Sequence, residues 1–303
     1  RADSVAVQAL LQQFEAVLKN KDANPAAVFS DTVQVTLAGG HPRARPLSME
    51  MLKELDLAKM TTIYKERLGD ASNMTFVGTV DLATLKPLVE QWIGALPVSG
   101  RTEAGRDVGP KLFQGTIDKT VRKGLAPQSQ TAFLVAGSGA WTREDAYLLS
   151  SVGEVLEMRL LDRLREELGG TYSVSVNTAF SRRPRQEWQV VISYGSAPEK
   201  ADTMFAAVRQ ELDSLRRVPP TAAEVERVKE QQRRELEVAR KQNNWWLSAL
   251  QQRIENGDDV TAVLSSDALI AGLTAEKLAE GAKRFLDEKN RARFVLLPEA
   301  KQP

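Results

Sequence analysis

Two segments with apolar residues at every second position directly follow a long apolar stripe, and together they constrain the fold more than any other feature of the chain. From Thr142 the apolar positions step by three or four residues, as one buried helix face does; they are Leu149, Val152, Leu156, Leu160, Leu164 and Leu168. Two strands are then expected over 172–180 and 188–194, because large side chains recur at every second position, as on one buried strand face; they are Tyr172, Val174, Val176, Thr178 and Phe180, followed by Trp188, Val190, Ile192 and Tyr194. Gly169 is placed to end the helix. A helix beside two paired strands predicts an α+β fold.

The rest of the chain repeats this mixture of helices and strands. We expect further helices over 4–20, from Ser48, and over 57–67, 81–94, 198–216 and 221–256, with strands over 33–37, 73–80, 116–123, 130–136 and 293–297. Residues 101–114 are rich in glycine and polar side chains and lack periodicity, which is typical of a linker. The sequence therefore predicts two related α/β units with mainly antiparallel sheets packed against helices. The first unit, residues 1–100, is incomplete, and the second covers residues 115–303.

Composition argues against several classes of function. The 303 residues include one histidine and no cysteine, so we do not expect this chain to build a His- or Cys-based metal site unaided. Lysine plus arginine (41) nearly balances aspartate plus glutamate (40), whereas a nucleic-acid-binding domain normally has a basic excess. No apolar run approaches the roughly 18 residues that span a bilayer, and no P-loop or Gly-x-Gly-x-x-Gly loop occurs. We expect neither nucleic acid nor membrane among the partners.

The segment from Arg165 to Tyr172, Arg-Glu-Glu-Leu-Gly-Gly-Thr-Tyr, is the strongest candidate site. A Gly-Gly turn can bring the cation and the phenol to one extended ligand. A purely structural role is the alternative. Arg165 could compensate the helix dipole, and Tyr172 could be a half-buried aromatic residue of the core. Elsewhere, His41 in its Gly-Gly-His-Pro turn fits a surface histidine, and Trp245 and Trp246 fit core or interdomain aromatics.

Several motifs, in order along the chain, resemble those of the pitrilysin/insulinase-like zinc metallopeptidases. The most specific is the segment 164–174, which is similar to a motif in the C-terminal half of that family. The other similar segments are 64–67, 73–78 with Asp81, 85–88 with 96–97, 244–247 and 295–299. The resemblance therefore covers nearly the whole chain.

The resemblance implies a full chain of four related α/β units, whose two halves close around an unfolded peptide. In such enzymes the first unit carries a His-x-x-Glu-His zinc motif, and the zinc polarises the scissile carbonyl and activates a water molecule. The C-terminal half supplies an arginine and a tyrosine that position the substrate, and by position these are Arg165 and Tyr172. Residues 1–100 then correspond to the later part of the third unit and residues 115–303 to the fourth.

This chain departs from the family pattern because it contains no His-x-x-Glu-His. We therefore expect it to be the C-terminal, substrate-binding portion of a zinc metalloendopeptidase, inactive alone and without catalytic or metal-binding residues. The zinc belongs to the full-length protein, in a unit upstream of Arg1, since the chain reads as a fragment or processed product. The expected partners are a peptide substrate and the N-terminal zinc-binding half, in the same chain or a partner subunit. The expected location is the periplasm, with the cytoplasm as the alternative.

Two other functions stay open at this point. Some members of the family are metal-less subunits or scaffolds, which can retain the arginine and the tyrosine. A peptide-binding module that works by strand addition is the third possibility, because α/β units have sheet edges. The sequence does not reveal whether an edge is free.

Overall fold

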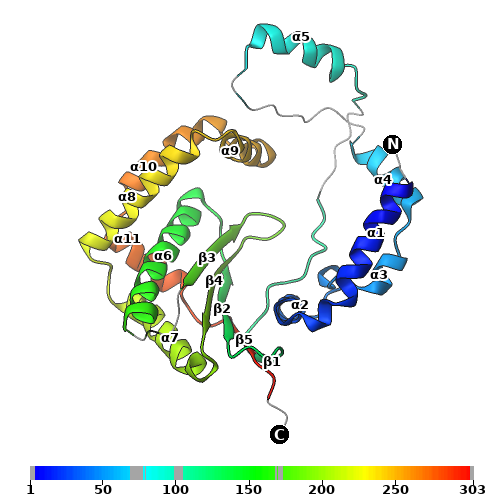
Figure 1. The fold of residues 1–303 in the computed structure, drawn as a ribbon. Helices are drawn as coiled ribbons and strands as arrows, with labels where there is room; N and C mark the ends of the chain where they lie inside the picture. Colours follow the sequence, from blue (N-terminus) through cyan, green and yellow to red (C-terminus); the bar gives the residue numbers. More distant parts are fainter. Residues whose placement is uncertain are drawn as a thin grey trace. The chain divides into compact units, whose positions relative to one another are not determined.

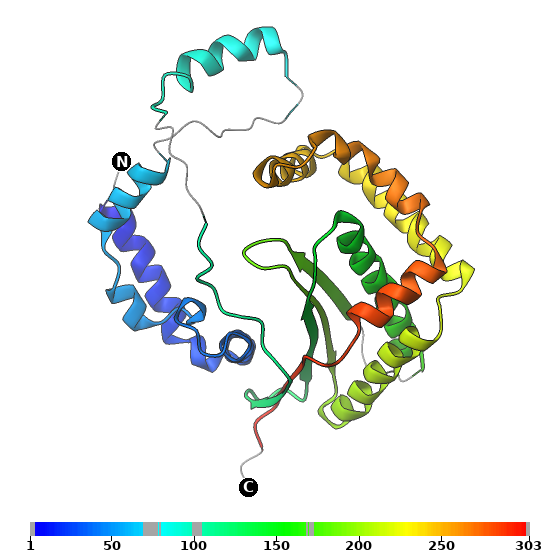
Figure 2. The same ribbon diagram turned by 180° about the vertical axis from the view of Figure 1, so that it is seen from behind.

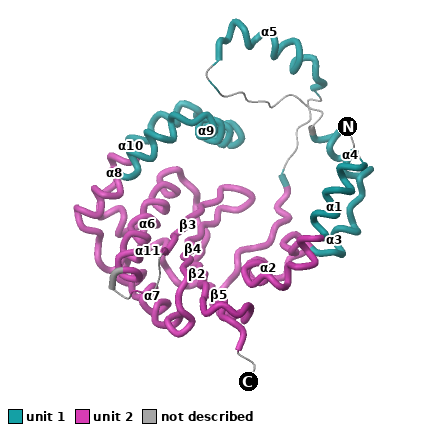
Figure 3. The backbone as a smooth tube through the Cα atoms, viewed as in Figure 1, with its two compact units in different colours: residues 1–15, 48–105, 231–268 teal, residues 16–47, 106–230, 269–303 magenta. Residues whose placement is uncertain are grey.

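The structure is a computed structural model that describes residues 4–68, 78, 80–98, 105–167, 169 and 173–300 (Figure 1). The chain divides into two compact units (Figure 3). Unit 1 comprises residues 1–15, 48–105 and 231–268, and unit 2 comprises residues 16–47, 106–230 and 269–303. The chain passes between the units several times, so they are not consecutive halves of the sequence. The correspondence of residues 1–100 and 115–303 to two family units stays a prediction.

In the described residues a group of helices precedes the first strand, and a second group of helices lies between the fourth strand and the fifth. The α-helices are α1 (Ser4–Lys19), α2 (Pro25–Leu37), α3 (Met49–Lys53), α4 (Leu57–Leu68), α5 (Leu82–Trp92), α6 (Arg143–Leu161), α7 (Ala201–Arg217), α8 (Ala222–Ala239), α9 (Asn243–Asn256), α10 (Ser266–Ala271) and α11 (Ala275–Phe285). The strands are β1 (Thr116–Arg122), β2 (Ser129–Ser138), β3 (Val174–Ser181), β4 (Glu187–Ser196) and β5 (Arg291–Leu297). A π-helical segment, η3 (Asp162–Glu167), continues α6, and short 3-10 turns are η1 (Lys21–Ala23), η2 (Pro42–Ala44), η4 (Pro198–Lys200) and η5 (Val260–Ser265).

Unit 2 is built around a five-stranded sheet in the order β1-β5-β2-β4-β3. The β2–β4, β2–β5 and β3–β4 pairs are antiparallel, and β1–β5 is parallel. The predicted class, helices packed on a mainly antiparallel sheet, is therefore confirmed. β3 begins shortly after Tyr172 in sequence and forms one edge of the sheet, and helix α6 packs against it.

Helices α6, α7 and α11 cover one face of this sheet and contact one another (Figure 1). The predicted stripe forms the centre of that layer, since Leu149, Val152, Leu156, Leu160 and Leu164 are all buried. Across from them lie the inward residues of β4, namely Trp188, Val190, Ile192 and Tyr194. Burying large apolar side chains on both elements contributes about 1.5–3 kcal/mol per residue, so this layer fixes α6 against the sheet.

Helix α2 packs on the opposite face of the sheet (Figure 2), and the prediction of a strand over 33–37 was wrong. Asn24 caps the helix by accepting hydrogen bonds from the backbone of Ala26 and Ala27, and Pro25 takes the first helical position. Phe29, Val33 and Leu37 recur every four residues and pack on Ala132, Leu134, Ala292, Phe294 and Leu296 of the sheet. The alternation of Val33, Val35 and Leu37 was too short to distinguish a strand from this helical face.

Unit 1 is helical in its described residues, and the predicted strand over 73–80 lies mostly outside them. The single helix predicted over 221–256 is wrong, because α8 ends at Ala239 and α9 begins at Asn243. Between them Gln242 has extended backbone angles. The indole Nε1 of Trp246 donates to the carbonyl oxygen of Arg240 at 2.8 Å, which satisfies an acceptor at the end of α8.

Helix α6 approaches β3 closely at Gly153, and this contact supports a first prediction. A Cβ atom at Gly153 would lie 2.6 Å from Cγ2 of Thr178. We expect Gly153→Leu to lower the free energy of unfolding by about 3 kcal/mol, because helix and strand must separate to admit the side chain. Chemical denaturation measures the change. Gly109→Leu is the control, since nothing lies within 4 Å of a Cβ built there, and an equal loss in both variants would contradict the prediction.

Candidate functional site

The candidate site begins where α6 ends. The helix begins directly after Thr142, where it was predicted to start, and the Thr142 side chain caps it by accepting a hydrogen bond from the backbone N–H of Asp145. After Leu161 the helix widens into the π-helical turn η3, a rare conformation that is often found at functional sites. Gly169 has φ +51°, and its N–H donates to the carbonyl oxygen of Arg165 at 3.1 Å. The predicted role of Gly169 in ending the helix is thus confirmed, with a π-helical turn in place of a regular one.

Arg165 lies on this turn with an exposed side chain, while the side chain of its neighbour Leu164 is fully buried. The buried leucine holds the turn on the core, and the arginine faces outward from it. Tyr172 lies outside the described residues, so its position relative to Arg165 stays a prediction. Of the two predicted substrate-binding residues, the structure therefore describes one.

A cluster of ion pairs anchors the last turns of α6 to the next two helices. Arg159 donates to both carboxylate oxygens of Glu224, from Nε at 2.6 Å and from Nη2 at 3.1 Å, and its Nη1 lies 3.6 Å from Glu211. Arg163, one turn later, donates to the other oxygen of Glu211 at 3.3 Å. Glu211 lies on α7 and Glu224 on α8, so two helices hold the arginines that precede Arg165.

Glu224 also completes a capping box at the start of α8. Its carboxylate accepts the N–H of Thr221 at 2.7 Å, while its own N–H donates to the Thr221 hydroxyl at 3.3 Å. The hydrogen bonds from Arg159, helped by those from Thr221 and opposed by partial burial, lower the pKa of Glu224 to about 2. The capping box joins residues three positions apart, whereas no local pattern links Glu224 to the arginine 65 positions away that binds it.

The edge of β3 that faces away from β4 is partly occupied. The N–H of Val176 donates to Oε2 of Glu157 at 2.8 Å, and Nε1 of Trp141 donates to the carbonyl oxygen of Phe180 at 3.2 Å. In an antiparallel pair, alternate residues turn their backbone groups toward and away from the neighbouring strand, so Val176 and Phe180 share this edge. A peptide that added along the whole of β3 would have to displace both contacts, which weakens the strand-addition hypothesis for this edge.

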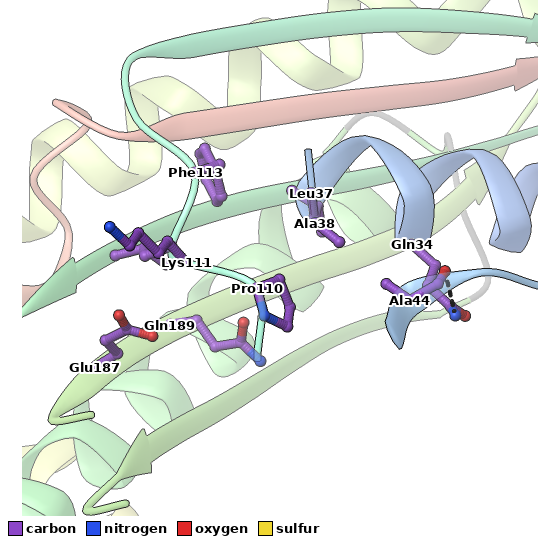
Figure 4. A pocket seen from close by; sticks show the side chains of 10 residues that line it. Gln34, Leu37, Ala38, Ala44, Pro110, Lys111, Phe113, Glu187 and Gln189 are labelled. Atoms are coloured by element: carbon purple, nitrogen blue, oxygen red, sulfur yellow. Dashed lines mark hydrogen bonds between the residues drawn. The ribbon is translucent and has the colours of Figure 1, made fainter. Parts of the chain in front are cut away.

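A shallow cavity of about 330 Å³ lies on the other face of unit 2, between α2 and the start of β4 (Figure 4). Its walls are Gln34, Leu37, Ala38, Ala44, Pro110, Lys111, Leu112, Phe113, Glu187 and Gln189. Arg185 holds one wall by donating to the carbonyl oxygens of Pro110 at 2.6 Å and Gly109 at 3.1 Å. The polar lining residues are one cation, one carboxylate and two amides, namely Lys111, Glu187, Gln34 and Gln189, and the other lining residues are apolar. This mixture does not indicate a single class of ligand.

The described residues do not fit a zinc site. They contain no group of three histidine, cysteine, aspartate or glutamate side chains that could hold a metal ion. The chain's one histidine, His41, uses Nδ1 to accept the N–H of Arg43 at 3.1 Å within the turn η2. Nor does any helix in the described part of the chain have the length and apolarity needed to cross a membrane.

Comparison with known proteins identifies the fold and the family. The family described as "Peptidase M16 inactive domain" matches residues 55–232, more than half of the chain. A curated relative from Arabidopsis thaliana, named "Zinc protease PQQL-like", is 23% identical over 269 residues, which is 82% of this chain and 28% of the relative. This chain therefore spans less than a third of that relative's length.

Solved structures share the fold over almost the entire chain. The periplasmic protease PqqL from Escherichia coli has a TM-score of 0.82 and 18% identity, covering 96% of this chain and 32% of the protease. A peptidase M16 inactive domain from Pseudomonas fluorescens has a TM-score of 0.79 and 17% identity, covering 99% of this chain and 72% of that one. The match to the inactive domain confirms the resemblance found on the motifs, and this chain belongs to the peptidase M16 inactive-domain family.

Proposed function

We propose that this chain is the substrate-binding, non-zinc-binding portion of a zinc metalloendopeptidase that encloses and hydrolyses peptides. The observation that carries the proposal is Arg165, an exposed cation on a π-helical turn that its buried neighbour Leu164 and the ion pairs of Arg159 hold in place. A cation displayed on a fixed turn is suited to bind a peptide carbonyl or the oxyanion that develops from it. The Tyr172 hydroxyl supplies the second hydrogen bond in this proposal.

The zinc in this proposal belongs to the other half of the longer protein. The Arabidopsis relative is named a zinc protease and is more than three times as long as its matched region, while this chain has one histidine and no cysteine. The N-terminal zinc-binding half is thus the main partner, and a peptide is the substrate. Because the PqqL protease of Escherichia coli is described as periplasmic, we propose the periplasm as the location.

The second candidate is a non-catalytic partner subunit of the same family. It is favoured by the description of the matching family as an inactive domain. In that case the longer protein would hold no zinc of its own, and Arg165 would bind peptide for an active partner or serve only as a charge near the helix end.

Metal content and proteolysis test both candidates. We expect the purified chain to contain no stoichiometric zinc and to cleave no quenched fluorescent peptide, and the full-length protein to contain zinc and to cleave the peptide until a chelator is added. Chelator-sensitive proteolysis by the 303-residue chain alone would overturn the proposal. A full-length protein without zinc or activity would favour the partner subunit.

A further inference from the structure

The five-stranded sheet of unit 2 has two edges, and they differ in how well they are covered. At the β3 edge helix α6 packs against the strand, and the side chains of Glu157 and Trp141 occupy two of its backbone groups. β1 forms the other edge, and within the described sheet its one neighbour is β5 (Figure 1). A strand at an open edge presents unpaired N–H and C=O groups to any strand that can pair with it.

The hydrogen bonds between β1 and β5 identify the residues whose backbone groups face away from the sheet. Gly115 accepts the N–H of Arg291 at 2.9 Å, and Lys123 donates its N–H to the carbonyl oxygen of Leu297 at 2.9 Å. Because successive residues of a strand direct their backbone groups to opposite sides, the odd-numbered residues of β1 bond to β5. The even-numbered residues therefore face the open edge; they are Thr116, Asp118, Thr120 and Arg122. No backbone partner for these groups occurs in the described part of the chain.

The side chains of these residues carry charges of both signs. Asp118, Thr120 and Arg122 project from one face of the strand, and all three are exposed. Asp118 has one oxygen 3.8 Å from Nη1 of Arg293, and its side chain is still 58% exposed. An acid and a base that lie four positions apart on one strand face are complementary to an antiparallel copy of the same strand.

We propose that two copies of this chain pair antiparallel through the open edges of β1. The hydrogen bonds form only in registers that set even-numbered residues opposite even-numbered residues. When Thr120 lies opposite Thr120 of the second copy, Asp118 of each chain lies opposite Arg122 of the other. Two opposite-charge pairs then flank a threonine pair, and both kinds of pair stabilise adjacent strands.

The neighbouring registers are excluded by like charges. If Asp118 lay opposite Thr120, Lys119 would lie opposite its own copy, and a shift in the other direction would set Lys119 opposite Lys123. Like charges directly opposite each other destabilise a strand pair. In the proposed register Lys119 instead lies opposite Val121, a half-exposed side chain that the lysine stem can cover. The lysine therefore selects this register and does not prevent pairing.

Sedimentation velocity of the purified 303-residue chain over a range of concentrations tests the pairing. We expect the wild type to show a monomer–dimer equilibrium. Asp118→Arg alone and Arg122→Asp alone each set like charges opposite each other twice, so each should weaken dimerisation about 10-fold or more. The double variant should restore the dimer. A mixture of the two single variants should form a heterodimer, because one has a base at both positions and the other an acid.

Two further variants separate pairing from folding. Thr120→Pro removes an N–H that faces the second copy and none that bonds to β5, and proline is tolerated in edge strands at such positions. It should abolish the dimer and leave the urea unfolding midpoint of the chain nearly unchanged. Glu144→Arg, at an exposed glutamate in the first turn of α6, is the control and should not alter dimerisation.

Three results would overturn the inference. A wild-type chain that is monomeric at every concentration leaves the edge of β1 to a strand of a different protein. A dimer that persists in Thr120→Pro uses another surface, and single charge variants that do not combine into a heterodimer contradict the register. The edge of β1 lies across the sheet from β3, and the pairing uses neither Arg165 nor Tyr172. The inference is therefore independent of the proposed function, and loss of the dimer should leave kcat of the full-length protein unchanged.

Discussion

Replacing Arg165 by alanine in the full-length protein is expected to lower kcat by about 100-fold, with a smaller change in KM. The guanidinium group is proposed to stabilise charge that develops on the substrate carbonyl, and the loss of one such donor typically costs 10²–10³-fold in kcat. A 100-fold loss corresponds to about 2.7 kcal/mol of transition-state stabilisation. Steady-state kinetics on a quenched fluorescent peptide measure the effect, and an unchanged kcat would reduce Arg165 to a charge near the helix end.

The controls for Arg165 follow from its exposure. Because the side chain is exposed on η3, the alanine variant should unfold at nearly the same denaturant concentration as the wild type. Arg165→Lys keeps the charge but not the planar fork of donors, so its kcat should fall between those of wild type and alanine. Arg122→Ala, at an exposed arginine on the distant strand β1 of the same unit, should leave kcat unchanged.

Local periodicity was enough to predict the framework around Arg165. The stripe from Leu149 to Leu164 extends over five apolar positions, too many for a strand, and the alternation in β3 and β4 is long enough to exclude a helix. Thr142 and Gly169 mark the ends of the helix by side-chain and backbone chemistry that depends only on near neighbours. These features are local, and the structure confirms them.

The predictions that were wrong or missing depended on too short a window or on contacts between residues far apart in sequence. Residues 33–37 are too few to distinguish the period of a strand from the period of a helix. The capping signal of Asn24 and Pro25, which identifies α2 as a helix, lies outside that short window. The contacts of Glu157 with Val176, and of Arg159 with Glu224, join elements that only the tertiary fold brings together. Sequence patterns therefore identified the exposed candidate, Arg165, but not the side chains that hold its surroundings.

Loss of the charge on Glu224 is expected to produce the largest electrostatic change in stability. The pKa of Glu224 is lowered from 4.5 to about 2, chiefly by its hydrogen bonds with Arg159. Such a shift corresponds to about 3 kcal/mol, and screening by solvent reduces it to about 2 kcal/mol, since the two side chains are 15% and 21% exposed. We therefore expect Glu224→Gln to lower the free energy of unfolding by about 2 kcal/mol at pH 7, as measured by urea denaturation.

The pH dependence identifies the cause of this loss. A lowered carboxylate pKa contributes stability that is fully present above the unfolded value of 4.5 and disappears as the pH falls toward 2. The difference between wild type and Glu224→Gln should therefore shrink over this range, whereas glutamine keeps an oxygen for the Thr221 capping contact throughout. Glu237→Gln, which breaks the exposed pair with Lys241, should change stability little at either pH. A difference between wild type and Glu224→Gln that stays constant from pH 7 to pH 2 would indicate lost packing, and Arg159 would then anchor α6 without help from the charge of Glu224.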